Sequence, residues 1–74
     1  MKDMTDDFRR HGARHPNDKP QVIYMTDKGD YCRETGPSRI RTHDDAAAWA
    51  RDHFCFIADS FARNCVTAFR VEWF

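Results

Sequence analysis

The sequence predicts a small α+β domain in which a three-stranded antiparallel sheet packs on one helix, in the order strand, strand, helix, strand. Three features support this fold: two strand-forming segments joined by a tight turn, a helix with capping residues at both ends, and a final segment of alternating polarity. A right-handed connection to the last strand places it beside the first strand, which gives the spatial order 2-1-3. We expect a two-layer ββαβ domain over residues 21–74, preceded by an arm over residues 1–20.

The arm is polar and charged, and Gly12, Pro16 and Pro20 interrupt any long element in it. Such a composition is typical of a flexible segment. Alternatively, Thr5 caps a short helix over residues 6–11, with Phe8 as its one large apolar anchor. A basic cluster in the arm is expected to be solvated rather than bound to phosphate: Arg9, Arg10, His11, Arg14 and His15.

A β-hairpin is predicted over residues 21–35. Residues 21–26, QVIYMT, are rich in β-branched and aromatic side chains and have four apolar residues in a row, which indicates a central strand. Asp27 to Asp30 form a turn in which Gly29 supplies a positive φ angle, and Tyr31 to Thr35 form the returning strand.

The loop length of this hairpin is left open, because a slip of one residue exchanges the two faces of a strand. A two-residue loop over 28–29 places Tyr24 beside Tyr31 and Arg33, whereas a three-residue loop with a bulge places Ile23 and Met25 there instead. In both cases Tyr31 and Arg33 share one face. Because an unpaired buried arginine is costly, we expect that face to point away from the helix.

The helix is predicted from Thr42 to Asn64. Thr42 and Asp45 have the spacing of a capping box, three alanines favour helix, and Asn64 suits a left-handed C-cap. At about 100° per residue, one apolar arc forms the core face. Its members are Ala46, Ala47, Ala50, Phe54, Ile57, Ala58 and Phe61.

Trp49 and Phe56 lie seven residues apart on a stripe outside that arc, flanked by Asp52 and Arg63. One interpretation is that a loop or the N-terminal arm covers the two rings, since single apolar residues at a surface are ordinary. The other is a partner-binding stripe, because aromatic side chains beside arginine match the composition of interface hot spots.

Cys65 to Phe74 alternate in polarity, which predicts the last strand. The apolar side of this strand is expected to pack against the helix. It carries Phe69, Val71 and Trp73. The other side joins the hairpin to form an aromatic and arginine surface of Tyr31, Arg33, Arg70 and Phe74, which Tyr24 joins if the hairpin loop has two residues. Such a surface suits stacked single-stranded bases, a protein, or the mate of a homodimer.

The charge balance excludes some classes of function. Twelve basic and twelve acidic residues give zero net charge, which argues against histone-like or ribosomal roles and against an acidic DNA mimic. A chain of 74 residues hides only about 60% of its unfolded surface, so docking or dimerisation is expected to add stability. No apolar run could cross a bilayer, and the N-terminus lacks a signal-peptide core, so we expect a cytoplasmic protein.

No catalytic or cofactor chemistry is predicted. The three cysteines and four histidines form no zinc framework, and no Walker motif or nucleophile elbow occurs. We expect buried thiols and surface histidines, no metal, no cofactor and no enzymatic activity.

The layout of "VIYMTDKGDYC", "THDDAAAWARD" and "TAFRVEWF" resembles that of very small phage and mobile-element accessory proteins, anti-CRISPR proteins among them. This resemblance implies a non-enzymatic inhibitor that occupies a surface of a larger host protein or ribonucleoprotein complex in the host cytoplasm. It transfers no functional residue.

We therefore expect a protein-binding module, with a single-stranded nucleic-acid-binding module as the alternative. The candidate contact residues are Trp49, Asp52, Phe56 and Arg63 on the helix and Tyr31, Arg33 and Arg70 on the sheet.

Overall fold

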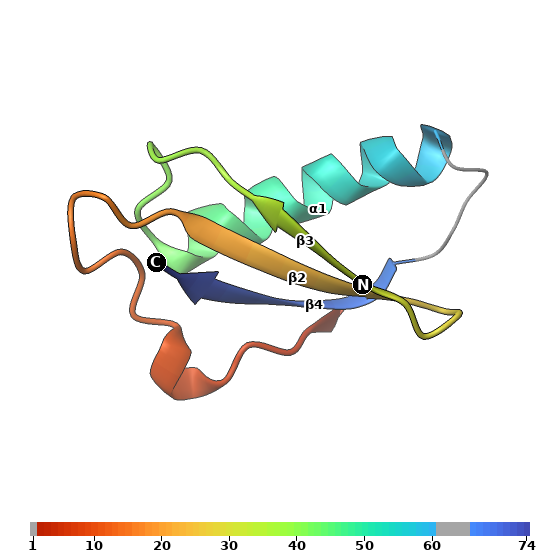
Figure 1. The fold of residues 1–74 in the computed structure, drawn as a ribbon, viewed down its shortest axis with the longest axis horizontal. Coiled ribbons are helices and arrows are strands. Elements are labelled where there is room, and N and C mark those ends of the chain that lie inside the picture. Colours follow the sequence, from red (N-terminus) through yellow and green to blue (C-terminus); the bar gives the residue numbers. More distant parts are fainter. Residues whose placement is uncertain (1, 61–65) are drawn as a thin grey trace.

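The computed structural model describes residues 2–60 and 66–74, with the backbone alone for residues 54–60. One helix, α1 (His43–Ser60), lies over one face of a four-stranded sheet (Figure 1). The strands lie in the order β1-β4-β2-β3. Their bounds are β1 (Lys2–Asp3), β2 (Pro20–Thr26), β3 (Tyr31–Thr35) and β4 (Val66–Trp73). The predicted α+β class is confirmed.

The three long strands have the predicted antiparallel order, β3-β2-β4. The expectation of a three-stranded, wholly antiparallel sheet is wrong, because β1 pairs in parallel with the outer edge of β4. Lys2 lies opposite Ala68, and Asp3 lies opposite Phe69. A strand of two residues carries no periodic signal, so the sequence pattern could not reveal it.

The hairpin has the longer of the two loops. Met25 pairs with Tyr31 and Ile23 with Arg33, and Gly29 has a φ angle of 84° in the turn. Tyr31 and Arg33 therefore share their face with Ile23, as the three-residue alternative requires. Tyr24 faces Cys32 on the helix side, where it is 9% exposed, so Tyr24 does not lie on the face with Tyr31 and Arg33.

The described core lies between α1 and the sheet. Its buried members are Val22, Tyr24, Ile40, Ala46, Ala47, Ala50, Phe69 and Val71, and Trp49, Val66 and Trp73 pack partly buried against them. The three alanines confirm the start of the predicted apolar arc. The side chains of Phe54, Ile57 and Ala58, together with Phe61, lie outside the described residues.

Thr42 caps the helix as predicted. Its Oγ1 accepts a hydrogen bond from the Asp45 backbone N–H at 3.2 Å, and its carbonyl accepts one from Ala46 at 3.0 Å. The first bond satisfies a donor that the first helical turn would otherwise leave free, and the second is the first bond of the helix itself.

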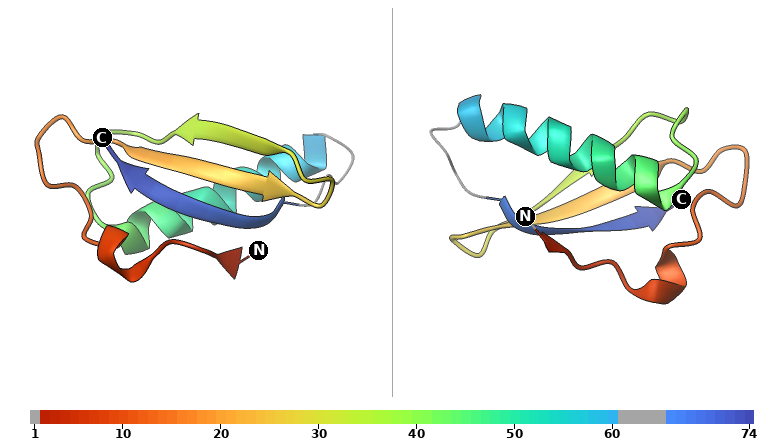
Figure 2. Two further views of the ribbon diagram at one scale, coloured as in Figure 1. Left: turned by 60° about the horizontal axis from the view of Figure 1, so that its bottom comes forward. Right: turned by 180° about the vertical axis from the view of Figure 1, so that it is seen from behind.

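The N-terminal segment runs along the β4 edge of the sheet (Figure 2). A 3₁₀ turn, η1 (Asp7–Arg9), stands where the short helix over residues 6–11 was expected, and no side chain caps it. Thr5 instead accepts a hydrogen bond from the Val71 N–H. Phe8 is 70% exposed, so its expected role as an apolar anchor is wrong.

Candidate functional site

The face of the sheet that points away from α1 is organised in rows across three strands. The middle row is Arg33 on β3, Ile23 on β2 and Arg70 on β4. Ile23 is only 8% exposed, while the two arginines are exposed on either side of it. Alternation along strands therefore puts two cations on a surface with an apolar floor.

Two large aromatic side chains extend this surface, which we call the open face. Tyr31 is 64% exposed and Phe74 is 59% exposed. The Arg33 guanidinium lies over the Phe74 ring, 5.9 Å from its centroid, a cation–π contact. The structure thus places Tyr31, Arg33 and Arg70 together on one face, as the alternation indicated. Their contact with a partner stays a prediction.

The cations of the open face differ in their pairing. Glu72 lies 3.1 Å from Arg9 of η1 and 3.8 Å from Arg70. Among the described side chains no carboxylate lies within ion-pair distance of Arg33. Arg33 is therefore the charge on this face that is most available to an outside acid.

A hollow of about 420 Å³ lies between the N-terminal segment and the open face. It is lined by Met4, Asp6, Arg9, Met25, Arg70 and Glu72. Its walls carry two cations and two anions, so its own charges largely balance. The hollow extends the open face past β4 toward the N-terminal segment.

On the helix side, Trp49 is half-buried rather than free. It packs against the core, and its ring stacks on His53 with centroids 4.7 Å apart. The Trp49 ring also lies close to Gly36, so the loop just after β3 covers part of it. Asp52 is exposed beside Trp49 in a hollow of about 370 Å³.

The other two helix candidates cannot be joined to this group. The Phe56 side chain and Arg63 lie outside the described residues. The described part of the stripe is Trp49 and Asp52, in a hollow lined also by Arg39, Ile40 and Asp45.

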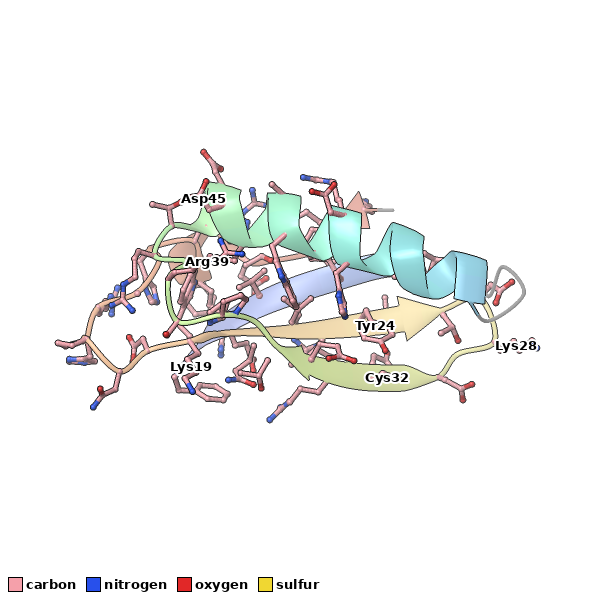
Figure 3. The ribbon with its side chains drawn as sticks, turned by 90° about the horizontal axis from the view of Figure 1, so that it is seen from above. Lys19, Tyr24, Lys28, Cys32, Arg39 and Asp45 are labelled. Carbon is pink, nitrogen blue, oxygen red and sulfur yellow. The ribbon has the colours of Figure 1, made fainter. Side chains whose placement is uncertain are left out.

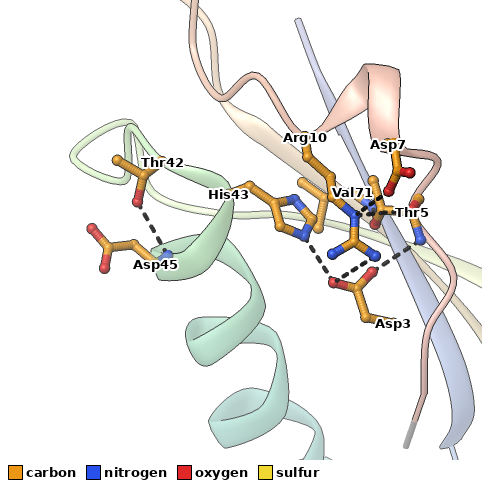
Figure 4. A network of polar contacts seen from close by, with 8 residues as sticks. All are labelled: Asp3, Thr5, Asp7, Arg10, Thr42, His43, Asp45 and Val71. Carbon is orange, nitrogen blue, oxygen red and sulfur yellow. Dashed lines mark hydrogen bonds and ion pairs between the residues drawn. The ribbon is translucent and has the colours of Figure 1, made fainter.

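A polar cluster that the sequence did not reveal ties the N-terminal segment to the helix (Figure 4). His43 is 6% exposed, and its Nε2 lies 2.8 Å from Oδ2 of Asp3, a residue 40 positions away. The Thr5 N–H donates to the other Asp3 oxygen at 2.9 Å. Arg10 lies near the same carboxylate at 3.9 Å. The cluster therefore anchors the N-terminal segment to the start of α1.

The Asp3 carboxylate is held in its charged form. Burial alone would raise the pKa of Asp3, but hydrogen bonds from Thr5 and His43 outweigh burial, and the pKa lies below its ordinary value of 3.8. Asp3 therefore remains a charged acceptor at neutral pH.

Two expectations about reactive side chains are wrong. Cys32 is exposed on β3, not buried, and His43 is buried rather than at the surface. Burial, followed by a hydrogen bond with Cys32 and the nearby charges of Cys32 and Glu34, raises the pKa of Tyr24 to about 12. The Tyr24 phenol is therefore protonated at neutral pH and is unsuited to act as a base.

Within residues 2–60 and 66–74, no three His, Cys, Asp or Glu side chains gather as metal ligands do. In the same part of the chain, no helix has the length and apolar character needed to cross a membrane.

The chain was compared with protein-family models, curated proteins and solved structures, and none of them matches it.

Proposed function

We propose that this protein is a non-enzymatic protein-binding module and that the open face of its sheet is the contact surface. The observation that carries the proposal is the middle row, in which Arg33 and Arg70 stand exposed on either side of the nearly buried Ile23. Tyr31 and Phe74 add exposed aromatic area beside this row. Arginine and aromatic side chains around an apolar floor are the composition of interface hot spots.

The charge of the open face supports a partner surface that presents a carboxylate. Among the described side chains, Arg33 contacts an aromatic ring and no acid, so its planar guanidinium can bind an incoming carboxylate without breaking a described pair. The resemblance to anti-CRISPR proteins supports one class of partner, a surface of a larger host defence complex. Binding there would block that complex by occupying its surface.

A nucleic-acid partner is the competing outcome. Glu72 lies on the open face, and net charge is zero, both of which oppose a phosphate backbone. Nucleic-acid binding would weaken steeply with added salt, whereas a protein contact made of a few arginine and aromatic side chains should weaken only modestly.

The test is a pull-down from lysate of the native host with four tagged proteins. These are the unsubstituted chain, the double variant Arg33→Ala with Arg70→Ala, and two controls, Arg14→Ala and Asp52→Ala. The control Arg14 is an exposed arginine of the N-terminal segment, and Asp52 is exposed on the helix side. We expect the double variant to lose at least roughly 30-fold in affinity for a retained protein, because each hot-spot side chain contributes about 2 kcal/mol.

Both controls should retain the protein at the level of the unsubstituted chain. Equal retention by the double variant, with an unchanged circular dichroism spectrum, would exclude the open face. Loss with Asp52→Ala alone would move the contact to the helix side. Retained material that disappears after nuclease treatment would favour the nucleic-acid function.

A further inference from the structure

The outer edge of β3 is unpaired in the part of the chain that the structure describes. At its two ends the β2–β3 ladder is fixed by hydrogen bonds from Gly36 N–H to the Pro20 carbonyl and from Thr26 N–H to the Asp30 carbonyl. Hydrogen-bonded and non-hydrogen-bonded pairs alternate along an antiparallel ladder. The backbone groups that point outward are therefore those of three residues: Tyr31, Arg33 and Thr35.

This edge is exposed on both faces of the strand. Four of the five β3 residues are exposed, and Glu34 is intermediate. Figure 3, which looks down on the helix, shows α1 over the sheet and β3 emerging beside it. Of the strands, α1 contacts β4 most closely. An incoming strand could thus pair with the outward backbone groups of β3 without displacing another described strand.

The edge lies between the two surfaces that the sequence singled out. Tyr31 and Arg33 project from it onto the open face. On the helix side, Trp49 packs near Gly36 directly after β3, and His53 lies 3.9 Å from Glu34. A segment added to this edge would place alternate side chains beside each surface.

The charges of β3 disfavour a second copy of the chain as the occupant. Antiparallel pairing of two such edges must set outward-facing residues against each other. The register that overlaps the whole strand sets Arg33 against Arg33. A shift of two residues in either direction sets Glu34 against Glu34 or against Asp30. Like charges directly opposite one another destabilise a strand pair, so the edge resists self-association.

We infer that β3 is the docking edge for an extended segment of a protein partner, which adds to the sheet as a further strand and carries an acidic side chain opposite Arg33. The inference rests on the proposed protein-binding function and names how the partner is held. Main-chain hydrogen bonds to Tyr31, Arg33 and Thr35 would supply affinity, and Arg33 would supply the preference for an acid.

The experiment begins with selection of a displayed library of random linear peptides on the immobilised protein. We expect the enriched peptides to share alternating β-branched residues around one aspartate or glutamate. One enriched peptide is then synthesised as the probe. Amide hydrogen exchange is measured on the unsubstituted protein with and without this peptide, and the outward N–H groups of Tyr31, Arg33 and Thr35 should become protected. The N–H groups of Cys32 and Glu34, which face β2, should be protected in both states.

A matched pair of variants tests the edge separately from the side chains. Thr35→Pro removes an outward N–H without removing a β2–β3 hydrogen bond, whereas Thr35→Ala keeps that N–H and loses the same side-chain bond to Gln21. We expect Thr35→Pro to weaken peptide binding by about tenfold or more and Thr35→Ala to change it by less than about threefold. Should Thr35→Pro unfold, the exchange measurement on the unsubstituted protein decides alone.

Three outcomes overturn the inference. They are an absence of enriched peptides, bound peptides that leave the three amides unprotected, and protection that rises with protein concentration without any peptide. If peptide binding falls with Arg70→Ala but the β3 amides stay unprotected, the open face binds and the edge does not. If the amides are protected but Arg33→Ala and Arg70→Ala have no effect, the edge binds, but the acidic preference assigned to Arg33 and the proposed open-face contact both fail.

Discussion

The two long edges of the sheet differ in how their backbone groups are paired. At the β4 edge, the Met4 N–H donates to the Phe69 carbonyl at 2.7 Å, and the Val71 N–H donates to Thr5 Oγ1 at 2.9 Å. At the β3 edge, no described residue pairs with the outward backbone groups. One edge is closed by the protein's own N-terminal segment, and the other remains open.

Burial explains why the N-terminal segment closes one edge only. Phe69 is 1% exposed and Val71 is 0% exposed, so unpaired backbone groups at these residues would be costly. Tyr31 and its neighbours on β3 are exposed, so water can satisfy their backbone groups. The difference indicates that the β4 edge serves stability and that the β3 edge is free to serve recognition.

The largest expected effect comes from Gly12, which lies where the N-terminal segment passes the start of the helix. Gly12 has a φ angle of 78°, and a Cβ there would lie 2.6 Å from the Arg41 carbonyl oxygen. The next residue, Ala13, donates its N–H to the same oxygen. Gly12→Ala should therefore lower the free energy of unfolding by about 2–4 kcal/mol, measured by urea unfolding.

The matched control is Gly29 in the hairpin turn of the open edge. Gly29 has a φ angle of 84°, but nothing lies within 4 Å of the position of its Cβ. Gly29→Ala should lower the free energy of unfolding by only about 1 kcal/mol, from the backbone angle alone. Equal losses at the two glycines would contradict the view that the closed side is the tightly packed one.

Much of the fold could be predicted because its signals are local. The turn at Gly29, the cap at Thr42 and the alternation of the last strand are each contained in a few neighbouring residues. The closing of the β4 edge could not be predicted. It depends on a two-residue strand and on the contact of Asp3 with His43, which brings together residues 40 positions apart.

The candidate site divides in the same way. Period-two alternation sufficed to place Tyr31, Arg33 and Arg70 on one face. The alternation could not decide the loop length, because both loops suit the same turn residues. The sequence therefore left undecided which face of the sheet carries Tyr24. Trp49 was ambiguous because its cover, the chain around Gly36, lies outside the helix and is placed only by tertiary packing.

A second comparison uses one threonine at each edge. Thr5 is 5% exposed, and its hydroxyl accepts from the Val71 N–H. Thr5→Val keeps the shape but leaves that buried N–H unpaired, so it should lower the free energy of unfolding by about 2 kcal/mol. Thr35→Val loses a bond to Gln21 but leaves no backbone N–H unpaired, so it should lower the free energy of unfolding by less, under about 1 kcal/mol. Thermal unfolding followed by circular dichroism measures both.

The two threonine variants also sharpen the assignment of roles. Thr5→Val should leave peptide binding at β3 unchanged wherever the protein is folded, because Thr5 lies at the opposite edge. A stability loss at Thr35 as large as that at Thr5 would mean that the β3 edge is also structural.

The smallest expected effect concerns pH and the anchor of the closed edge. Burial raises the pKa of Asp3, but bonds from Thr5 and His43 lower it by more, so the folded pKa lies below the ordinary value of 3.8. A carboxyl with a lowered folded pKa adds stability above its unfolded pKa, and this stability is lost as pH falls through the folded pKa. Asp3→Asn should therefore cost about 1 kcal/mol near neutral pH.

That difference should shrink toward zero in strong acid, where the native Asp3 becomes protonated and resembles the amide. Urea unfolding of both proteins across the acid range measures the change. Asp7→Asn is the control, because Asp7 also lies in the N-terminal segment, but its side chain is fully exposed and only 3.8 Å from Arg10 in a surface pair. The difference in the free energy of unfolding between Asp3→Asn and the unsubstituted protein could instead stay constant with pH. That result would show that Asp3 holds the β4 edge closed by shape rather than by charge. The open β3 edge should respond to neither substitution.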